Sequence, residues 1–194
     1  MRRETILEIA RDMFFTEGYA AVSMSAIAAR LGGSKGTLYN YFASKEELFS
    51  AVMTQHFDRV GALMRSLAVE SGDMAERLRV FGFKFLNLIL SDDYLRLYRL
   101  VTAEAARFPE IGGAFQGKGM MAHKQALADF FESQMTAGVL RRADPALAAR
   151  QFLDLCRSDL QRQRVWNIIP AASEAELRAQ AAQATEAVMT LYAP

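Results

Sequence analysis

Residues 22–42 read VSMSAIAARLGGSKGTLYNYF, two short segments with apolar residues at helical spacing, joined by a pair of glycines. Ser23 and Ser34 stand where helix N-caps are expected, because a serine hydroxyl accepts hydrogen bonds from the free amides of the first turn. Gly32 and Gly33 allow the chain to turn sharply between the two segments without a side-chain clash. Two short helices separated by a glycine-containing turn form the helix-turn-helix pattern.

The second segment also has the chemistry of a DNA-binding surface. Between residues 30 and 45 the chain holds Arg30, Lys35 and Lys45 but no Asp or Glu. Side chains able to bond phosphate oxygens or base edges lie among them, namely Ser34, Thr37, Tyr39, Asn40 and Tyr41. The expected helix N-termini near Ser23, Ser34 and Ser44 add backbone donors and partial positive charge.

Composition limits where such a surface can be. The 23 basic and 22 acidic residues leave a net charge of +1, so a nucleic-acid site must be local. An apolar content of 52% with 23% charged residues is typical of a soluble globular protein. The single cysteine, Cys156, cannot form an internal disulfide, and neither a signal peptide nor a membrane span is apparent. We therefore expect a cytoplasmic protein that does not enter a membrane.

Helical periodicity extends over the whole sequence, and no stretch alternates as a strand would. The expected helices cover residues 3–17, 24–31, 35–42, 45–68, 74–90, 93–107, 118–137, 145–166 and 174–192, with a short turn around 109–115. This indicates an all-α fold in which an N-terminal three-helix helix-turn-helix domain is joined by a long helix to a C-terminal helical bundle. The expected domains are 1–44, for DNA binding, and 45–194, for effector binding and dimerisation.

Four motifs connect residues 5–60 to a known family: Phe14-x-x-x-Gly18-Tyr19, Ser23-Met24-Ser25-x-Ile27-Ala28, Gly36-Thr37-Leu38-Tyr39-x-Tyr41-Phe42 and Ser44-Lys45-Glu46-x-Leu48. In this order they closely resemble the TetR-type bacterial transcriptional regulators. The C-terminal half, through residues 94–100 and 104–110, resembles the AefR-like subgroup of that family.

The resemblance implies roles for individual residues. The segment 35–41 would enter the major groove of double-stranded DNA, with Ser34 at its start. Phosphates would be held by Ser23, Ser25, Tyr39, Tyr41 and Lys45. Base edges would be read by Lys35, Gly36, Thr37 and Asn40, with Lys35 the best candidate for guanine.

The resemblance also implies a ligand cavity and a dimer in the second half. Large apolar side chains there are usually core, yet aromatics and pliable methionines also suit a hydrophobic small-molecule effector. The candidate lining is Phe81, Phe85, Tyr98, Phe115, Met120, His123, Phe130 and Trp166. The alanine-rich segment 171–187, together with 145–166, looks like the two-fold four-helix interface of a homodimer.

No enzyme signature accompanies these features. We find no phosphate-binding glycine loop, no metal-binding spacing and no nucleophile beside a base, so no catalytic residue, metal or cofactor is expected. Cys156 lies in an apolar helical stretch and is interpreted as a buried core residue rather than a redox sensor. The expected function is a transcriptional repressor released from a palindromic operator by a small hydrophobic effector. The alternative is a helical ligand-binding or scaffolding protein whose basic face meets a protein partner.

Overall fold

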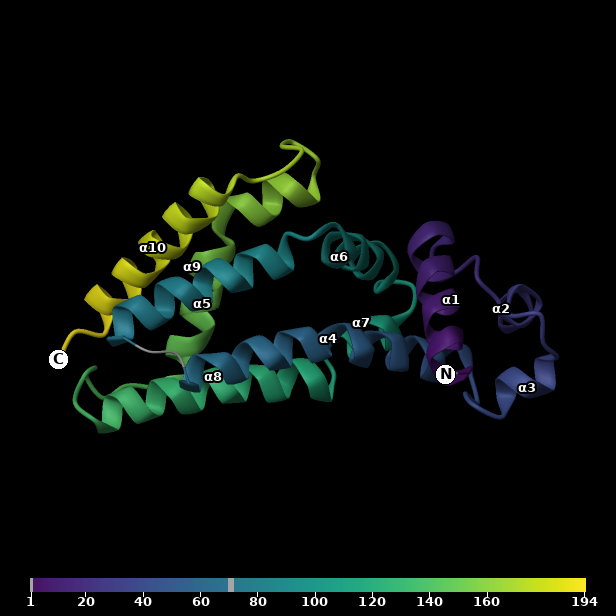
Figure 1. Cartoon of the computed structure of the whole chain (residues 1–194), viewed down its shortest axis with the longest axis horizontal. Helices are drawn as coiled ribbons and strands as arrows, with labels where there is room; N and C mark the ends of the chain where they lie inside the picture. Colours follow the sequence, from purple (N-terminus) through teal and green to yellow (C-terminus); the bar gives the residue numbers. More distant parts are fainter. Residues whose placement is uncertain (1, 70–71) are drawn as a thin grey trace. The chain divides into compact units, whose positions relative to one another are not determined.

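The computed structural model describes residues 2–69 and 72–194, which are helical and contain no strand (Figure 1). The helices are α1 (Arg2–Glu17), α2 (Met24–Arg30), α3 (Lys35–Tyr39), α4 (Lys45–Val69), α5 (Met74–Ile89), α6 (Asp92–Glu104), α7 (Pro109–Gln116), α8 (Lys118–Thr136), α9 (Pro145–Val165) and α10 (Glu174–Leu191). The predicted all-α fold is confirmed.

Two compact units make up the chain, and their limits differ from the predicted domains. The first unit combines Met1–Asp58 with Arg96–Gly117, and the second combines Arg59–Leu95 with Lys118–Pro194. The first unit therefore contains α7 and most of α6 in addition to α1, α2 and α3. The division by function at residue 44 stays a prediction.

An aromatic cluster forms the core of the first unit. The rings of Phe14, Tyr19 and Phe49 lie with their centroids 5.1–5.6 Å apart, and the two contacts of Phe49 are edge-to-face. The ring of Phe108 adds a further edge contact, with its centroid 5.3 Å from that of Tyr19. Pairs in this geometry are favourable beyond the area they bury. Tyr19, which follows α1, is thus fixed from several sides.

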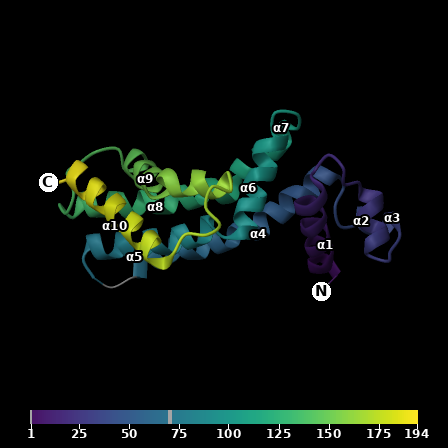
Figure 2. The same ribbon diagram turned by 90° about the horizontal axis from the view of Figure 1, so that it is seen from above.

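In the second unit α10 packs along α5, and α8 packs along α9 (Figures 1 and 2). Gly82 on α5 permits the first of these close approaches. A Cβ atom at this position would lie 3.1 Å from the Cβ of Ala181 on α10 and 3.4 Å from the Sγ of Cys156 on α9. Small residues on both helices therefore set the spacing of α5 and α10.

The predicted turn around residues 109–115 is wrong, because these residues belong to α7. Pro109 occupies a first-turn position, where its missing N–H costs nothing. Ile111 and Phe115, four residues apart, bury the same face of the helix. Their burial outweighs the low helix propensity of Gly112 and Gly113.

Helix α9 contains a break that the sequence pattern did not predict. Ser158 has φ 35° and ψ −136°, a conformation that non-glycine residues rarely adopt. Close to it, the carbonyl oxygen of Leu155 accepts a hydrogen bond of 2.8 Å from Nε2 of Gln180 on α10. The side chain of Gln180 on α10 thus supports the backbone of α9 next to the break.

The packing at Gly82 leads to a stability prediction. Gly82→Leu should lower the free energy of unfolding by about 1–3 kcal/mol, because extra atoms in a well-packed core force their neighbours apart. Gly113→Leu in α7 is the matched control, since a Cβ there has open space around it. Urea unfolding of the two variants measures the difference. Equal stability of both variants would contradict the close approach of α5 and α10.

The position of Cys156 leads to a prediction of its reactivity. Its side chain is fully buried, and this burial raises the pKa of the thiol to about 12. The nucleophilic thiolate is therefore scarce at pH 8 and shielded from reagents. We expect no reaction with Ellman's reagent in the folded protein and one equivalent after unfolding in urea. Rapid labelling of the folded protein would show an accessible thiol instead.

Candidate nucleic-acid interface

Serine caps start the two helices of the helix-turn-helix as the sequence predicted. The Ser23 hydroxyl accepts a hydrogen bond of 3.1 Å from the amide of Ala26, and the Ser34 hydroxyl accepts one of 3.1 Å from the amide of Thr37. Each bond satisfies an amide that has no partner within its own helix. Both caps are local, so the sequence alone specifies where α2 and α3 begin.

Gly32 makes the turn between these helices. Its φ of 68° lies in the left-handed region, which glycine adopts without a side-chain penalty. The apolar side chains of Ile27 on α2 and Leu38 on α3 are fully buried on the inner side of the turn. Helix α3 ends at Tyr39 rather than at the predicted residue 42, and Asn40 forms its C-cap.

The outer face of α3 presents polar and aromatic groups to solvent. Tyr39 is 46% exposed and Tyr41 is 40% exposed, values that are high for large aromatic residues. The other residues predicted to contact DNA are also exposed, apart from half-buried Thr37 and Lys45: Ser23, Ser25, Ser34, Lys35, Gly36 and Asn40. The Thr37 hydroxyl lies 3.0 Å from that of Ser34. The residues predicted to contact DNA therefore lie in one stretch of the chain, residues 23–45, and most of them are exposed.

Lys45, at the start of α4, has a structural role that the sequence analysis missed. Its Nζ donates hydrogen bonds to the carbonyl oxygens of Tyr19 at 2.9 Å and Val22 at 3.0 Å. The same atom lies 4.1 Å from the centre of the Tyr19 ring, a cation–π distance. Two of its three N–H donors are thus used within the protein, and one is left for the predicted phosphate contact.

The Tyr19 hydroxyl extends this connection to the next residue of α4. It donates a hydrogen bond of 3.3 Å to Oε1 of Glu46. Burial, with the negative charge of Glu46 as a smaller cause, raises the pKa of Tyr19 above its ordinary value, so the hydroxyl stays protonated. A hydrogen bond from Ser44 is the main reason that the pKa of Glu46 is lowered. The carboxylate is therefore charged at neutral pH and remains an acceptor.

The residues predicted to line an effector cavity come from both units. Phe81, Phe85 and Phe130 are buried in the second unit, whereas Tyr98 and Phe115 belong to the first unit, where their ring centroids lie 6.2 Å apart. Trp166 is 65% exposed. The side chains of Met120 and His123 lie outside the described residues. The aromatic lining therefore stays a prediction.

The described part of the chain carries neither a metal-binding cluster nor a membrane-spanning helix. Its His, Cys, Asp and Glu side chains form no group of three that could hold a metal ion. Each helix there is too short or too polar to traverse a lipid bilayer.

Comparison with known families matches both halves of the chain. Residues 6–52 match the model of bacterial regulatory proteins of the tetR family, and residues 76–194 match the C-terminal domain of AefR-like transcriptional repressors. The chain belongs to the TetR family of bacterial transcriptional regulators. As a member of this family it is a DNA-binding regulator of transcription and not an enzyme.

Individual relatives of this TetR-family protein differ in the sign of their regulation. The transcriptional regulator UidR of Escherichia coli K12 is 27% identical over 79% of this chain and 76% of its own length. The transcriptional activator FasR of Mycolicibacterium smegmatis is 37% identical over 52% of this chain, and the match spans 45% of FasR. KstR of the same organism, a transcriptional repressor, is 32% identical over 54% of each chain.

Solved structures of the family extend the similarity over almost the whole chain. A protein from Mesorhizobium loti MAFF303099, described as a TetR-family transcriptional regulator, superimposes with a TM-score of 0.85 at 28% identity and covers 98% of this chain and 96% of its own. The flavonoid-responsive regulator FrrA gives a TM-score of 0.79 at 29% identity with the same coverage.

Stability and DNA affinity separate the roles of Lys45 and Tyr39. Lys45→Met leaves the carbonyls of Tyr19 and Val22 without their donor, so we expect a loss of about 1–3 kcal/mol in unfolding free energy as well as weaker DNA binding. Tyr39→Phe should weaken DNA binding and leave stability within about 0.5 kcal/mol of wild type. Urea unfolding and fluorescence anisotropy with labelled duplex measure the two quantities. Wild-type stability of Lys45→Met would assign this residue to phosphate contacts alone.

Proposed function

We propose that this TetR-family regulator is a homodimeric repressor that a small apolar effector releases from a palindromic operator in the cytoplasm. The match of residues 76–194 to AefR-like repressor domains and the similarity to KstR support repression. FasR shows that the family also contains activators, so the repression has to be tested directly.

The exposed aromatic face of α3 carries the DNA-binding part of the proposal. Tyr39 and Tyr41 leave 46% and 40% of their surfaces exposed, and their hydroxyls are suited to phosphate oxygens. Lys35 and Asn40 lie at the two ends of α3 and supply donors for guanine and for an adjacent base or phosphate. Ser23 and Ser25 at the start of α2, together with Ser34, would hold the flanking backbone.

The dimer would form through the outer sides of α9 and α10. Helix α10 buries Leu177, Ala181 and Ala184 within its own chain and leaves Ala179 exposed. On α9 the apolar Leu155 is also exposed. Small and apolar outer faces allow helices of two copies to approach closely in a four-helix interface. Such a two-fold dimer would place its recognition helices about 34–36 Å apart, one turn of DNA, or a multiple of that distance.

The switch requires an effector that distinguishes two conformations. In one conformation the two recognition helices fit the operator, and in the other they are out of register with it. A ligand that binds the C-terminal helices more tightly in the second conformation lowers operator affinity, and the operator lowers ligand affinity by the same free energy of coupling. A coupling of about 1–3 kcal/mol changes operator affinity 5–150-fold. The name of FrrA, a flavonoid-responsive regulator, supports the response of this fold to small organic molecules.

Salt dependence and one substitution test the reading of DNA. With an operator selected from random duplexes, the logarithm of the association constant should fall by about 0.9 per phosphate contact for each tenfold rise in salt. Lys35→Ala should reduce the preference for operator over random duplex by about 1–3 kcal/mol if Lys35 reads a guanine. A flat salt dependence would favour the alternative, a scaffold that meets a protein partner.

Charge placed on α10 tests the dimer. Ala179→Glu and Ala182→Glu should each convert the dimer to monomers, because a buried unpaired carboxylate is costly at an interface. Ala193→Glu, an exposed site beyond the C-terminal end of α10, is the matched control and should stay dimeric. Sedimentation equilibrium reports the mass. Dimers in all three variants would place the interface elsewhere.

A further inference from the structure

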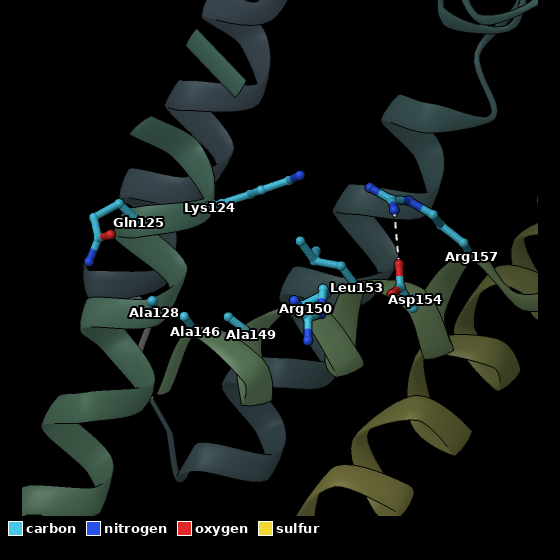
Figure 3. A pocket seen from close by; sticks show the side chains of 9 residues that line it. All are labelled: Lys124, Gln125, Ala128, Ala146, Ala149, Arg150, Leu153, Asp154 and Arg157. Carbon is cyan, nitrogen blue, oxygen red and sulfur yellow. Dashed lines mark hydrogen bonds and ion pairs between the residues drawn. The ribbon is translucent and has the colours of Figure 1, made fainter. Parts of the chain in front are cut away.

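A pocket of about 370 Å³ lies between α8 and α9 within the second unit (Figure 3). Its volume falls in the range of about 300–1,000 Å³ that small-molecule sites occupy. Lys124, Gln125 and Ala128 come from α8, and the remaining lining residues come from α9: Ala146, Ala149, Arg150, Leu153, Asp154 and Arg157. None of them belongs to the aromatic set that the sequence predicted.

The lining has an excess of positive charge. Three cations, Lys124, Arg150 and Arg157, surround a single carboxylate, that of Asp154. Asp154 is already paired with Arg157, with 3.0 Å between its Oδ1 and Nη1 of the arginine. Within the described residues neither Lys124 nor Arg150 forms an ion pair. The four charged side chains of the pocket thus sum to about +2, and no ion pair among the described residues offsets this excess.

The three cations line the same pocket from two helices. Lys124 reaches from α8 toward α9 across the pocket (Figure 3). Arg150 and Arg157 are seven residues apart on α9, which is about two helical turns, so they lie on the same side of that helix. The guanidinium carbon of Arg157 also lies 5.6 Å from the centre of the Phe85 ring, which helps to fix its position. A negatively charged group in the pocket would be attracted by all three cations.

The rest of the wall is apolar and formed by small side chains. Ala128, Ala149 and Leu153 are buried, and Ala146 lies in the first turn of α9. Small side chains leave room beside the helices for a ligand body, whereas the cations lie around its charged end. The pocket therefore combines an apolar surface with a cationic one, as a ligand of mixed character requires.

We propose that this pocket binds a small organic carboxylate, with its apolar body against the alanines and Leu153 and its carboxylate held by Lys124, Arg150 and Arg157. Arginine presents parallel N–H donors that match the two oxygens of a carboxylate, and lysine adds a compact charge. The regulatory consequence rests on the proposed function: this carboxylate is the effector that changes operator affinity.

The charged end of the pocket lies next to the break in α9. Arg157 directly precedes Ser158, and Leu155 near the break is bonded to Gln180 of α10. A ligand carboxylate competes with Asp154 for Arg157 and so acts on the backbone just before the irregular residue. The occupied pocket is thereby connected to α9 and α10, the helices of the proposed dimer interface.

Binding of matched acids and neutral analogues tests the site without DNA. The probes are benzoate, 2-naphthoate and decanoate, each compared with its primary amide by calorimetry on the full-length protein. We expect at least one acid to bind at least tenfold more tightly than its amide. Lys124→Gln and Arg150→Gln should each reduce that preference, whereas Arg142→Gln, an exposed arginine outside the pocket, should not.

A filling substitution provides a test that does not depend on charge. Ala146→Phe should abolish binding of acid and amide alike, because the ring occupies the pocket, while circular dichroism confirms that the protein is folded. The proposal is overturned if no acid binds more tightly than its amide, or if the preference survives both Lys124→Gln and Arg150→Gln.

The regulatory part is measured separately, as operator affinity with and without the bound acid. A weaker operator complex, lost again in Lys124→Gln, supports both the site and the proposed repressor. Carboxylate binding that leaves operator affinity unchanged upholds the site and contradicts release by this effector. The two proposals therefore fail in different experiments.

Discussion

The ammonium group of Lys45 holds together the part of the molecule that reads DNA. It joins the first turn of α4 to the carbonyls of Tyr19 and Val22, in the segment that leads from α1 into α2. Tyr19 is itself fixed by the rings of Phe14 and Phe49 and by its bond to Glu46. With its supporting helices fixed in this way, α3 buries only Leu38 and exposes Tyr39, and Tyr41 just after the helix is exposed as well. The same lysine thus secures the scaffold and has one further N–H donor for the proposed phosphate contact.

The proposed regulation depends on the pocket that lies between α8 and α9 in the second unit. Gly82 and Ala181 bring α5 and α10 into close contact, whereas α8 and α9 leave a pocket lined by cations between them. Helix α9 is irregular at Ser158, where the pocket ends. A ligand there would contact a helix that already departs from regular geometry. Coupling to the DNA-binding helices requires that the ligand binds one arrangement of this helix more tightly than another.

Sequence alone predicted the features that depend on neighbouring residues and missed those that depend on distant ones. The caps at Ser23 and Ser34 and the turn at Gly32 follow from contacts within a few residues. The bonds of Lys45 join residues 23 and 26 positions apart, so periodicity gave no sign of them. The pocket depends on Lys124 and Arg150 from two helices, and such charges resemble an ordinary solvated face. The break in α9 occurs at a serine, which carries no local signal for it.

Amide hydrogen exchange with and without operator DNA tests the central claim, that the outer face of α3 enters the duplex. Slower exchange is expected on operator binding in the segment from Ser34 to Tyr41 and around Ser23, because phosphates and base edges cover these amides. Random duplex at the same salt concentration should give weaker protection of the same segments. Unchanged exchange across residues 23–45, with protection confined to the C-terminal helices, would contradict the account.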